Sequence, residues 1–76
     1  MKIDPESFEE WMANPLTEAL MQTCARWEQQ AKTLWVNASW GAGQTDAVTL
    51  ARLREQARTL ERIRNISPEE IEEATE

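Results

Sequence analysis

Apolar residues recur at helical spacing along two long stretches of this 76-residue chain. In the first, about residues 15–38, they stand three or four positions apart, which places them along one side of an α-helix. These residues are Leu16, Leu20, Cys24, Trp27, Ala31, Leu34 and Ala38, with Trp35 widening the stripe. The second stretch, about residues 46–64, repeats the pattern with Ala47, Leu50, Leu53, Ala57, Leu60 and Ile63. No alternating pattern typical of a strand competes, so the chain is predicted to be all-α.

The three prolines mark predicted helix starts. Each follows a residue whose side chain can cap a helix, and proline is tolerated at the first helical position because the N–H that it lacks would have no partner there. The pairs are Asp4-Pro5, Asn14-Pro15 and Ser67-Pro68. They predict a short helix within residues 1–14, the start of the first long helix at Pro15, and a short acidic helix within residues 67–76.

The polar stretch between the two long helices predicts a turn. Gly41 or Gly43 can end the first helix in the left-handed conformation, and Thr45 or Asp46 can cap the second. Helices of similar length joined by a short loop favour an antiparallel hairpin. The predicted architecture is therefore one domain, residues 1–76, whose segments are an N-terminal clip (1–14), two long helices (15–38 and 46–64) and an acidic C-terminal segment (67–76).

The N-terminal clip is too short to persist alone, because a helix of about two turns is not stable in water without packing. Phe8 and Trp11 stand three residues apart and share a face of it. We expect Trp11 to be buried against the hairpin or against a second copy of the chain. Its replacement by alanine would then leave a largely unfolded or dissociated chain.

The length and composition indicate that the hydrophobic core of a single chain is too small to be stable without a further source of stability. A domain of this size is marginal without disulfides, a metal or a partner. The one cysteine, Cys24, can form no intramolecular disulfide, and the absence of histidine excludes a Cys/His zinc site. The sequence therefore predicts a homo-oligomer, most simply a dimer in which two hairpins form a four-helix bundle.

Charge is distributed unevenly along the chain, whose net charge is −6. Residues 1–14 sum to −3, residues 52–64 to +3 and residues 65–76 to −5. An overall acidic excess repels nucleic acid and anionic membranes, so neither is an expected partner. The N-terminus has no apolar core of a signal peptide and no apolar run is long enough to span a membrane, so a reducing cytoplasm is the expected location.

Candidate chemistry in the sequence is weak. The glycines of the turn lack the Lys-Ser/Thr of a phosphate-binding loop, and adjacent glutamates point to different faces of a helix. Cys24 lies on the apolar stripe, and the chain has no histidine to activate it. We therefore predict no catalytic residue, no cofactor and no metal, and a non-enzymatic protein–protein interaction module rather than an enzyme.

Two features indicate protein contacts. The chain has four tryptophans and no tyrosine, more indole rings than one hairpin and a clip can cover, and tryptophan is a frequent interface anchor. Three arginines spaced by four residues form a ridge whose repulsion needs acidic groups from this chain or a neighbouring copy, although an ordinary solvated face explains it equally well. The candidate interaction residues are Phe8, Trp11, Trp27, Trp35, Trp40, Arg54, Arg58 and Arg62.

The residues around the first two helix starts carry a resemblance to a known group. A Phe-x-x-Trp helix runs into an Asn-Pro step and a Thr-x-Ala-Leu helix start, and the chain ends in acidic residues. The matching residues are Phe8, Trp11, Asn14, Pro15, Thr17, Ala19 and Leu20, with Glu69, Glu70, Glu72 and Glu73 at the end. This pattern, specific over about residues 7–20, resembles small phage-encoded accessory proteins of unassigned function, which have Asn or His at the proline step.

Such proteins are often encoded among head-morphogenesis genes, so the resemblance implies a virion-assembly accessory that lies in the host cytoplasm or is associated with the virion. Its expected partners are itself and a phage virion or host protein. The alternative is a phage-encoded inhibitor whose acidic surface engages a host defence or nucleic-acid-binding protein. A mimic of nucleic acid needs a continuous band of carboxylates, whereas the acidic residues here cluster at the two chain ends, which favours assembly.

Overall fold

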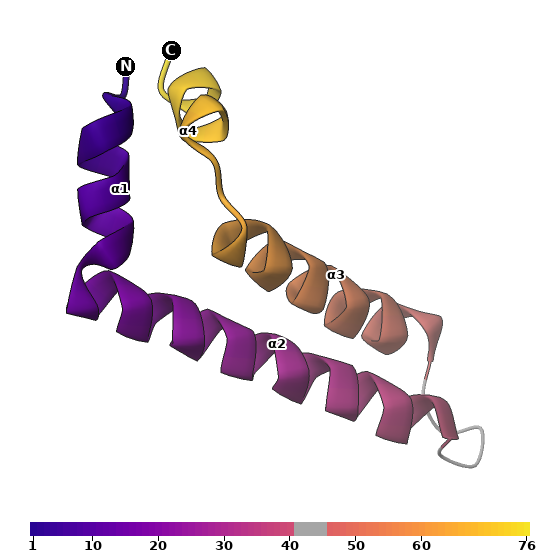
Figure 1. Ribbon diagram of the computed structural model, residues 1–76. Coiled ribbons are helices and arrows are strands. Elements are labelled where there is room, and N and C mark those ends of the chain that lie inside the picture. Colours follow the sequence, from indigo (N-terminus) through magenta and orange to yellow (C-terminus); the bar gives the residue numbers. More distant parts are fainter. Residues whose placement is uncertain (41–45) are drawn as a thin grey trace.

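The computed structural model describes residues 1–40 and 46–76, which form four helices (Figure 1). They are α1 (Pro5–Ala13), α2 (Pro15–Trp40), α3 (Ala47–Arg64) and α4 (Pro68–Ala74). Helices α2 and α3 run side by side in opposite directions, α1 turns away from the start of α2, and the two termini lie close together. The predicted all-α class and the helical hairpin are confirmed, and α2 is two residues longer than expected.

The step from α1 to α2 is built as the sequence predicts. The backbone at Asn14 is extended, as expected for a residue before proline, and its side-chain Oδ1 accepts a hydrogen bond of 2.8 Å from the N–H of Leu16. The first helix start differs from the prediction, because the Asp4 side chain caps no backbone N–H. It instead accepts a hydrogen bond of 3.2 Å from the Ser7 hydroxyl.

Side-chain caps also begin the last two helices. The carboxylate of Asp46 accepts from the N–H of Thr49 at 2.7 Å, and this bond lowers the pKa of the Asp46 carboxyl. The hydroxyl of Ser67 accepts from the N–H of Glu70 at 3.3 Å, as predicted. The other predicted turn residues, Gly41, Gly43 and Thr45, lie outside the described residues.

The inward side of α2 follows a strict alternation of four and three residues, the heptad spacing of helices that pack side by side. The buried or partly buried residues that follow this alternation are Thr17, Met21, Cys24, Glu28, Ala31, Trp35 and Ala38, and Thr23 and Ala25 are partly buried beside them. On α3 the corresponding residues are Leu50, Leu53, Ala57, Leu60 and Arg64. The interface of the hairpin therefore carries small and polar side chains as well as leucines.

This arrangement corrects the predicted stripe of α2. Cys24, Ala31 and Ala38 of that stripe face inward as predicted, and so does Trp35. Its other four members, Leu16, Leu20, Trp27 and Leu34, are 48–79% exposed. The helix is therefore turned from the expected position by roughly half of the step between successive residues. The prediction took the most apolar residue of each turn, whereas the position between the helices that Trp27 was expected to fill is taken by Glu28. On α3, Ala47 and Ile63 are exposed, and Arg64 rather than Ile63 turns inward.

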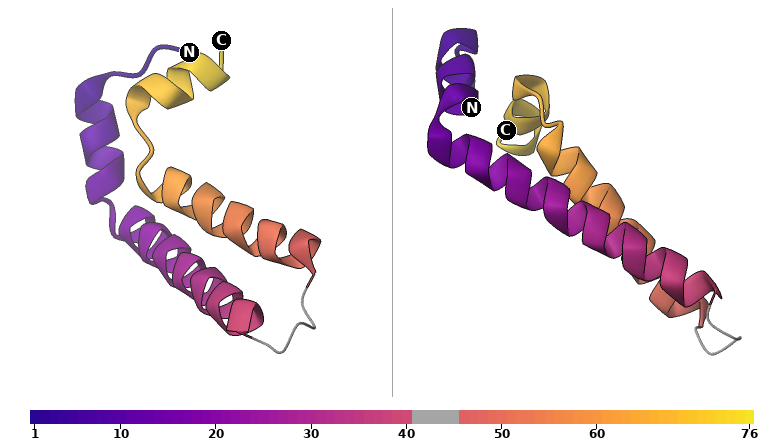
Figure 2. Two further views of the ribbon diagram at one scale, coloured as in Figure 1. Left: turned by 90° about the vertical axis from the view of Figure 1, so that its right-hand side faces the viewer. Right: turned by 60° about the horizontal axis from the view of Figure 1, so that its bottom comes forward.

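The molecule is a single layer of helices. Its Cα atoms span 51 × 28 × 11 Å, and the radius of gyration is 16.1 Å, against about 11 Å for a compact domain of this length. Among the described residues the buried apolar side chains are Cys24, Ala31 and Ala57, all small. Both broad faces of the hairpin are therefore open, and the right-hand view of Figure 2, in which α2 and α3 overlap, shows how narrow the hairpin is from that side. The dimeric bundle stays a prediction.

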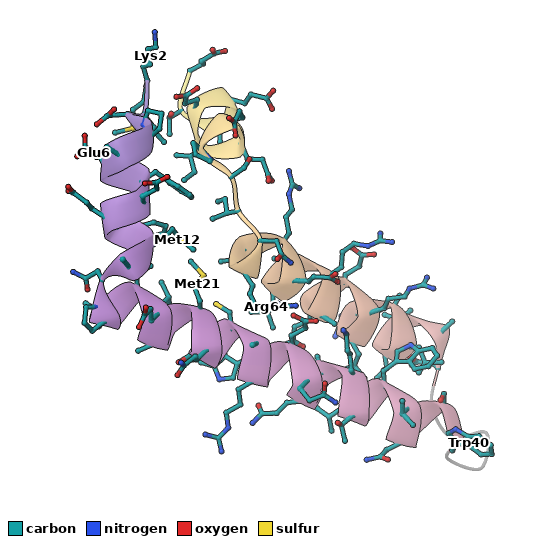
Figure 3. The ribbon with its side chains drawn as sticks, in the orientation of Figure 1. Lys2, Glu6, Met12, Met21, Trp40 and Arg64 are labelled. Carbon is teal, nitrogen blue, oxygen red and sulfur yellow. The ribbon has the colours of Figure 1, made fainter. Side chains whose placement is uncertain are left out.

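The N-terminal clip packs differently from the prediction. Trp11 is 42% exposed, so its expected burial against the hairpin is wrong, and burial by a second copy stays a prediction. Its ring lies 5.8 Å from that of Phe8, which is partly buried. Met12 points instead toward the hairpin, near Met21 of α2 (Figure 3). Phe8 and Met12 are four residues apart and share the inward face of α1, which leaves Trp11 at its edge.

Replacing Asn14 by alanine tests the step between α1 and α2. Loss of a side-chain cap typically costs about 0.5–2 kcal/mol. In a domain of this size each kcal/mol lowers the melting midpoint by roughly 4–8 °C. Thermal melts followed by circular dichroism measure this shift. The control is Asn37→Ala, an exposed position within α2 that caps nothing. Equal midpoints for the two variants would contradict the capping role.

Candidate protein-interaction surfaces

A buried carboxylate, Glu28, joins the two long helices. It is 5% exposed, and its Oε2 lies 2.7 Å from Nζ of Lys32, one turn further along α2. Its Oε1 lies 3.0 Å and 3.1 Å from Nη2 and Nε of Arg64 on α3. Both carboxylate oxygens are therefore paired, which a buried charge requires. This cluster was not predicted from the sequence, although the four-residue spacing of Glu28 and Lys32 was a signal for the pair within α2.

Titration of the cluster follows from this geometry. The hydrogen bond from Lys32 is the largest cause of a lowered pKa of the Glu28 carboxyl; burial opposes it, and Arg64 adds to it. The same bond raises the pKa of Lys32. Because the pKa of the Glu28 carboxyl is lower in the folded chain than its ordinary value of 4.5, the ionised carboxylate stabilises the fold at pH values above 4.5. This stabilisation is lost as the pH falls through the pKa of the folded chain. The contribution of Lys32 to the stability of the fold is present below pH 10.5, the ordinary pKa of lysine, and is lost as the pH rises through the raised pKa of Lys32.

Each of the two broad faces of the hairpin is called a flank below. One flank holds a groove of about 440 Å³, here called the arginine groove. Its apolar lining is Trp35, Val36, Leu53 and Ala57, and its charged lining is Lys32, Arg54, Arg58 and Glu61. Three of the predicted interaction residues, Trp35, Arg54 and Arg58, therefore come together from two helices. An apolar groove with cationic side chains suits a segment that carries both apolar and acidic residues.

Trp27 lies on the opposite flank, where it lines a different hollow with Gln56 and Leu60 of α3. Leu20, Trp27 and Leu34 are spaced by seven residues, and Leu16 precedes Leu20 by four, so all four follow one side of α2. These residues form the apolar flank: Leu16, Leu20, Trp27 and Leu34. The three leucines were predicted to lie inside the hairpin, so their place on the surface is a correction.

The remaining candidate residues lie apart from both surfaces. Trp40 is exposed at the end of α2 that is farthest from the termini (Figure 3). Nε of Arg62 lies 3.4 Å from Oε2 of Glu70 on α4, so the acidic tail offsets the arginine ridge within the same chain. Arg58 also pairs with Glu55 at 3.4 Å. Such exposed pairs contribute little to stability.

The two acidic segments meet at one end of the molecule (Figure 1). The N–H of Ile3 donates to Oε1 of Glu72 at 2.7 Å, and the N-terminal ammonium group lies 3.5 Å from the carbonyl oxygen of Thr75. Residues 1–14 and 65–76, both acidic, therefore share this end, and the basic helix α3 leads into it. The sequence alone did not predict that the two chain ends meet.

The described part of the chain contains no group of three or more side chains that could hold a metal ion, and none of its helices is long and apolar enough to cross a membrane. Cys24 is buried as a free thiol. Comparison with protein-family models, with curated proteins and with solved structures finds no significant match. The resemblance to small phage proteins therefore depends on the motif residues alone.

The variant Glu28→Gln tests the buried ion cluster. We expect its thermal midpoint at neutral pH to fall below that of the parent, because Lys32 and Arg64 lose their anionic partner. The gap should begin to narrow below pH 4.5, where Glu28 of the unfolded chain binds a proton, and should close as the pH falls through the lowered pKa of the carboxyl in the folded chain. Melts across this pH range, with the exposed Glu69→Gln as the control, measure both effects. A gap that stays constant with pH would show that charge at Glu28 is not what stabilises the hairpin.

Proposed function

We propose that this chain is a non-enzymatic protein–protein interaction module that serves as a phage virion-assembly accessory and binds both itself and a virion protein. The observation that carries the proposal is the single helical layer with two chemically different open flanks. One flank exposes leucines and Trp27, and the other holds the arginine groove. Contiguous exposed apolar side chains on a small protein typically mark an interaction site.

The two flanks suit two different partners at once. A chain that is one layer thick places them on opposite sides of the same helix pair, so occupying one does not block the other. That is the arrangement that an accessory protein needs when it joins copies of itself to another protein. The arginine groove, with Trp35 in its lining, fits an acidic segment of the virion protein.

The phage context rests on the motif of the first two helices. Asn14 caps α2 where the resembled proteins have their Asn/His-Pro step, and Thr17 of the Thr-x-Ala-Leu start is buried. These residues support the resemblance, because each has a structural role, capping or burial, at a position that belongs to the motif.

A second candidate function is supported by the acidic end of the molecule. Because residues 1–14 and 65–76 meet there, two acidic segments that are far apart along the sequence lie at one end of the molecule. An inhibitor of a host defence or nucleic-acid-binding protein would place this end against a basic site.

A pull-down of the tagged chain from infected cells tests the function. We expect a virion protein to copurify with the parent, and Arg54→Glu to lose it because the charge of the groove is reversed. Lys2→Glu is the control, since Lys2 is an exposed cation that lines neither the arginine groove nor the hollow of Trp27.

The identity of the captured protein decides between the two functions. A host protein that is kept by Arg54→Glu but lost on replacing the exposed Glu69 and Glu73 by lysine would contradict assembly and support the inhibitor.

A further inference from the structure

The chain exposes more surface than a folded protein of its mass. Its accessible surface is 6106 Å², whereas about 4,800 Å² is ordinary for a monomer of 8.8 kDa. The excess of about 1,300 Å² per chain exceeds the roughly 800 Å² per partner of a standard interface and lies in the range of permanent homodimers. One flank covered by a second copy would therefore bring the chain to the surface area of an ordinary folded protein.

Charge indicates which flank a second copy can cover. In a two-fold dimer the same patch of both copies meets, so a charged patch meets its own charge. On the arginine groove, Arg54 and Arg58 would face the same arginines of the partner. The apolar flank carries no charged residue among its four members, and the hollow beside Trp27 is lined by one cation, Arg52, and one anion, Glu55, whose charges balance. Such a surface is self-complementary.

The spacing of the apolar flank indicates how the two copies meet. Trp27 lies at its centre, and Leu20 and Leu34 stand seven residues on either side. If α2 of a second copy runs antiparallel, with a two-fold axis at Trp27, Leu20 of each chain meets Leu34 of the other. Antiparallel pairing also places the acidic ends of the two copies apart, whereas parallel pairing would put them side by side.

We infer that a second copy of this chain covers the apolar flank, with the two α2 helices antiparallel and the two Trp27 rings at the two-fold axis. This inference deepens the proposed function, on whose self-association it rests. From Leu16 to Leu34 the contact runs along about 27 Å of helix. It leaves both arginine grooves of the dimer open to other proteins, because they lie on the opposite flanks.

The first test compares Leu34→Glu with Val36→Glu by sedimentation equilibrium. Both residues lie on α2 and are about half exposed, at 56% and 47%, but Val36 lines the arginine groove. We expect Leu34→Glu to raise the dimer dissociation constant at least about 30-fold, as for the loss of an interface anchor, and Val36→Glu to leave it unchanged. A loss of helicity confined to Leu34→Glu also supports the inference, because a residue exposed in the single chain is needed for folding only if a partner covers it.

The second test addresses orientation by mixing two single variants, Leu20→Lys and Leu34→Glu. Antiparallel pairing predicts a heterodimer, because position 20 of each chain meets position 34 of the other. One of these two contacts then joins the two substituted positions, which carry opposite charges, and the other keeps the original pair of leucines. Each variant alone should dimerise weakly. If the mixture forms no more dimer than the separate variants, the antiparallel arrangement is wrong.

Failure of the inference can be separated from failure of the proposed function. A folded monomeric parent, or a Leu34→Glu variant that dimerises as the parent does, overturns the inference even where a virion protein copurifies with the chain. If the parent dimerises through this flank but captures no phage protein from infected cells, the inference stands and the assembly function fails.

Discussion

The ion pair between Glu28 and Arg64 sets the rotation of α2 on which the surface of this molecule depends. A carboxylate between two helices must be paired, and Arg64 at the end of α3 supplies two of its contacts while Lys32 supplies the third. With Glu28 turned inward, Trp27 must turn outward, and so must Leu20 and Leu34 at seven-residue spacing. The inward position of one polar residue thus accounts for an exposed row of large apolar residues.

Much of the fold could be predicted from local chemistry. The Pro15 and Pro68 starts, the caps at Asn14, Asp46 and Ser67, and the hairpin follow from interactions between residues close in sequence. The rotation of α2 could not be predicted, because it depends on a contact between Glu28 and Arg64, which are 36 residues apart. Ranking residues by hydrophobicity selected Trp27 where the structure buries its polar neighbour.

The candidate site was predicted only in part for the same reason. Trp35, Arg54 and Arg58 were identified as residues, and the structure shows that they line one groove. The leucines of the apolar flank were assigned to the interior, so their part in a surface was missed. An amphipathic pattern shows which residues avoid water, but it does not distinguish burial within the chain from burial by another chain.

The buried apolar side chains at the centre of the hairpin are small, whereas large apolar side chains lie on its surface. Ala31 and Ala57 let the two helices approach closely but remove little apolar surface from water, so the hairpin alone is weakly stabilised. The large apolar side chains of α2 that could stabilise it lie on a flank that the rest of the described chain leaves exposed. Folding and association would then be coupled, since each copy supplies the surface that the other needs. In the proposed dimer the groove on the other flank, which is lined by charged as well as apolar residues, stays open.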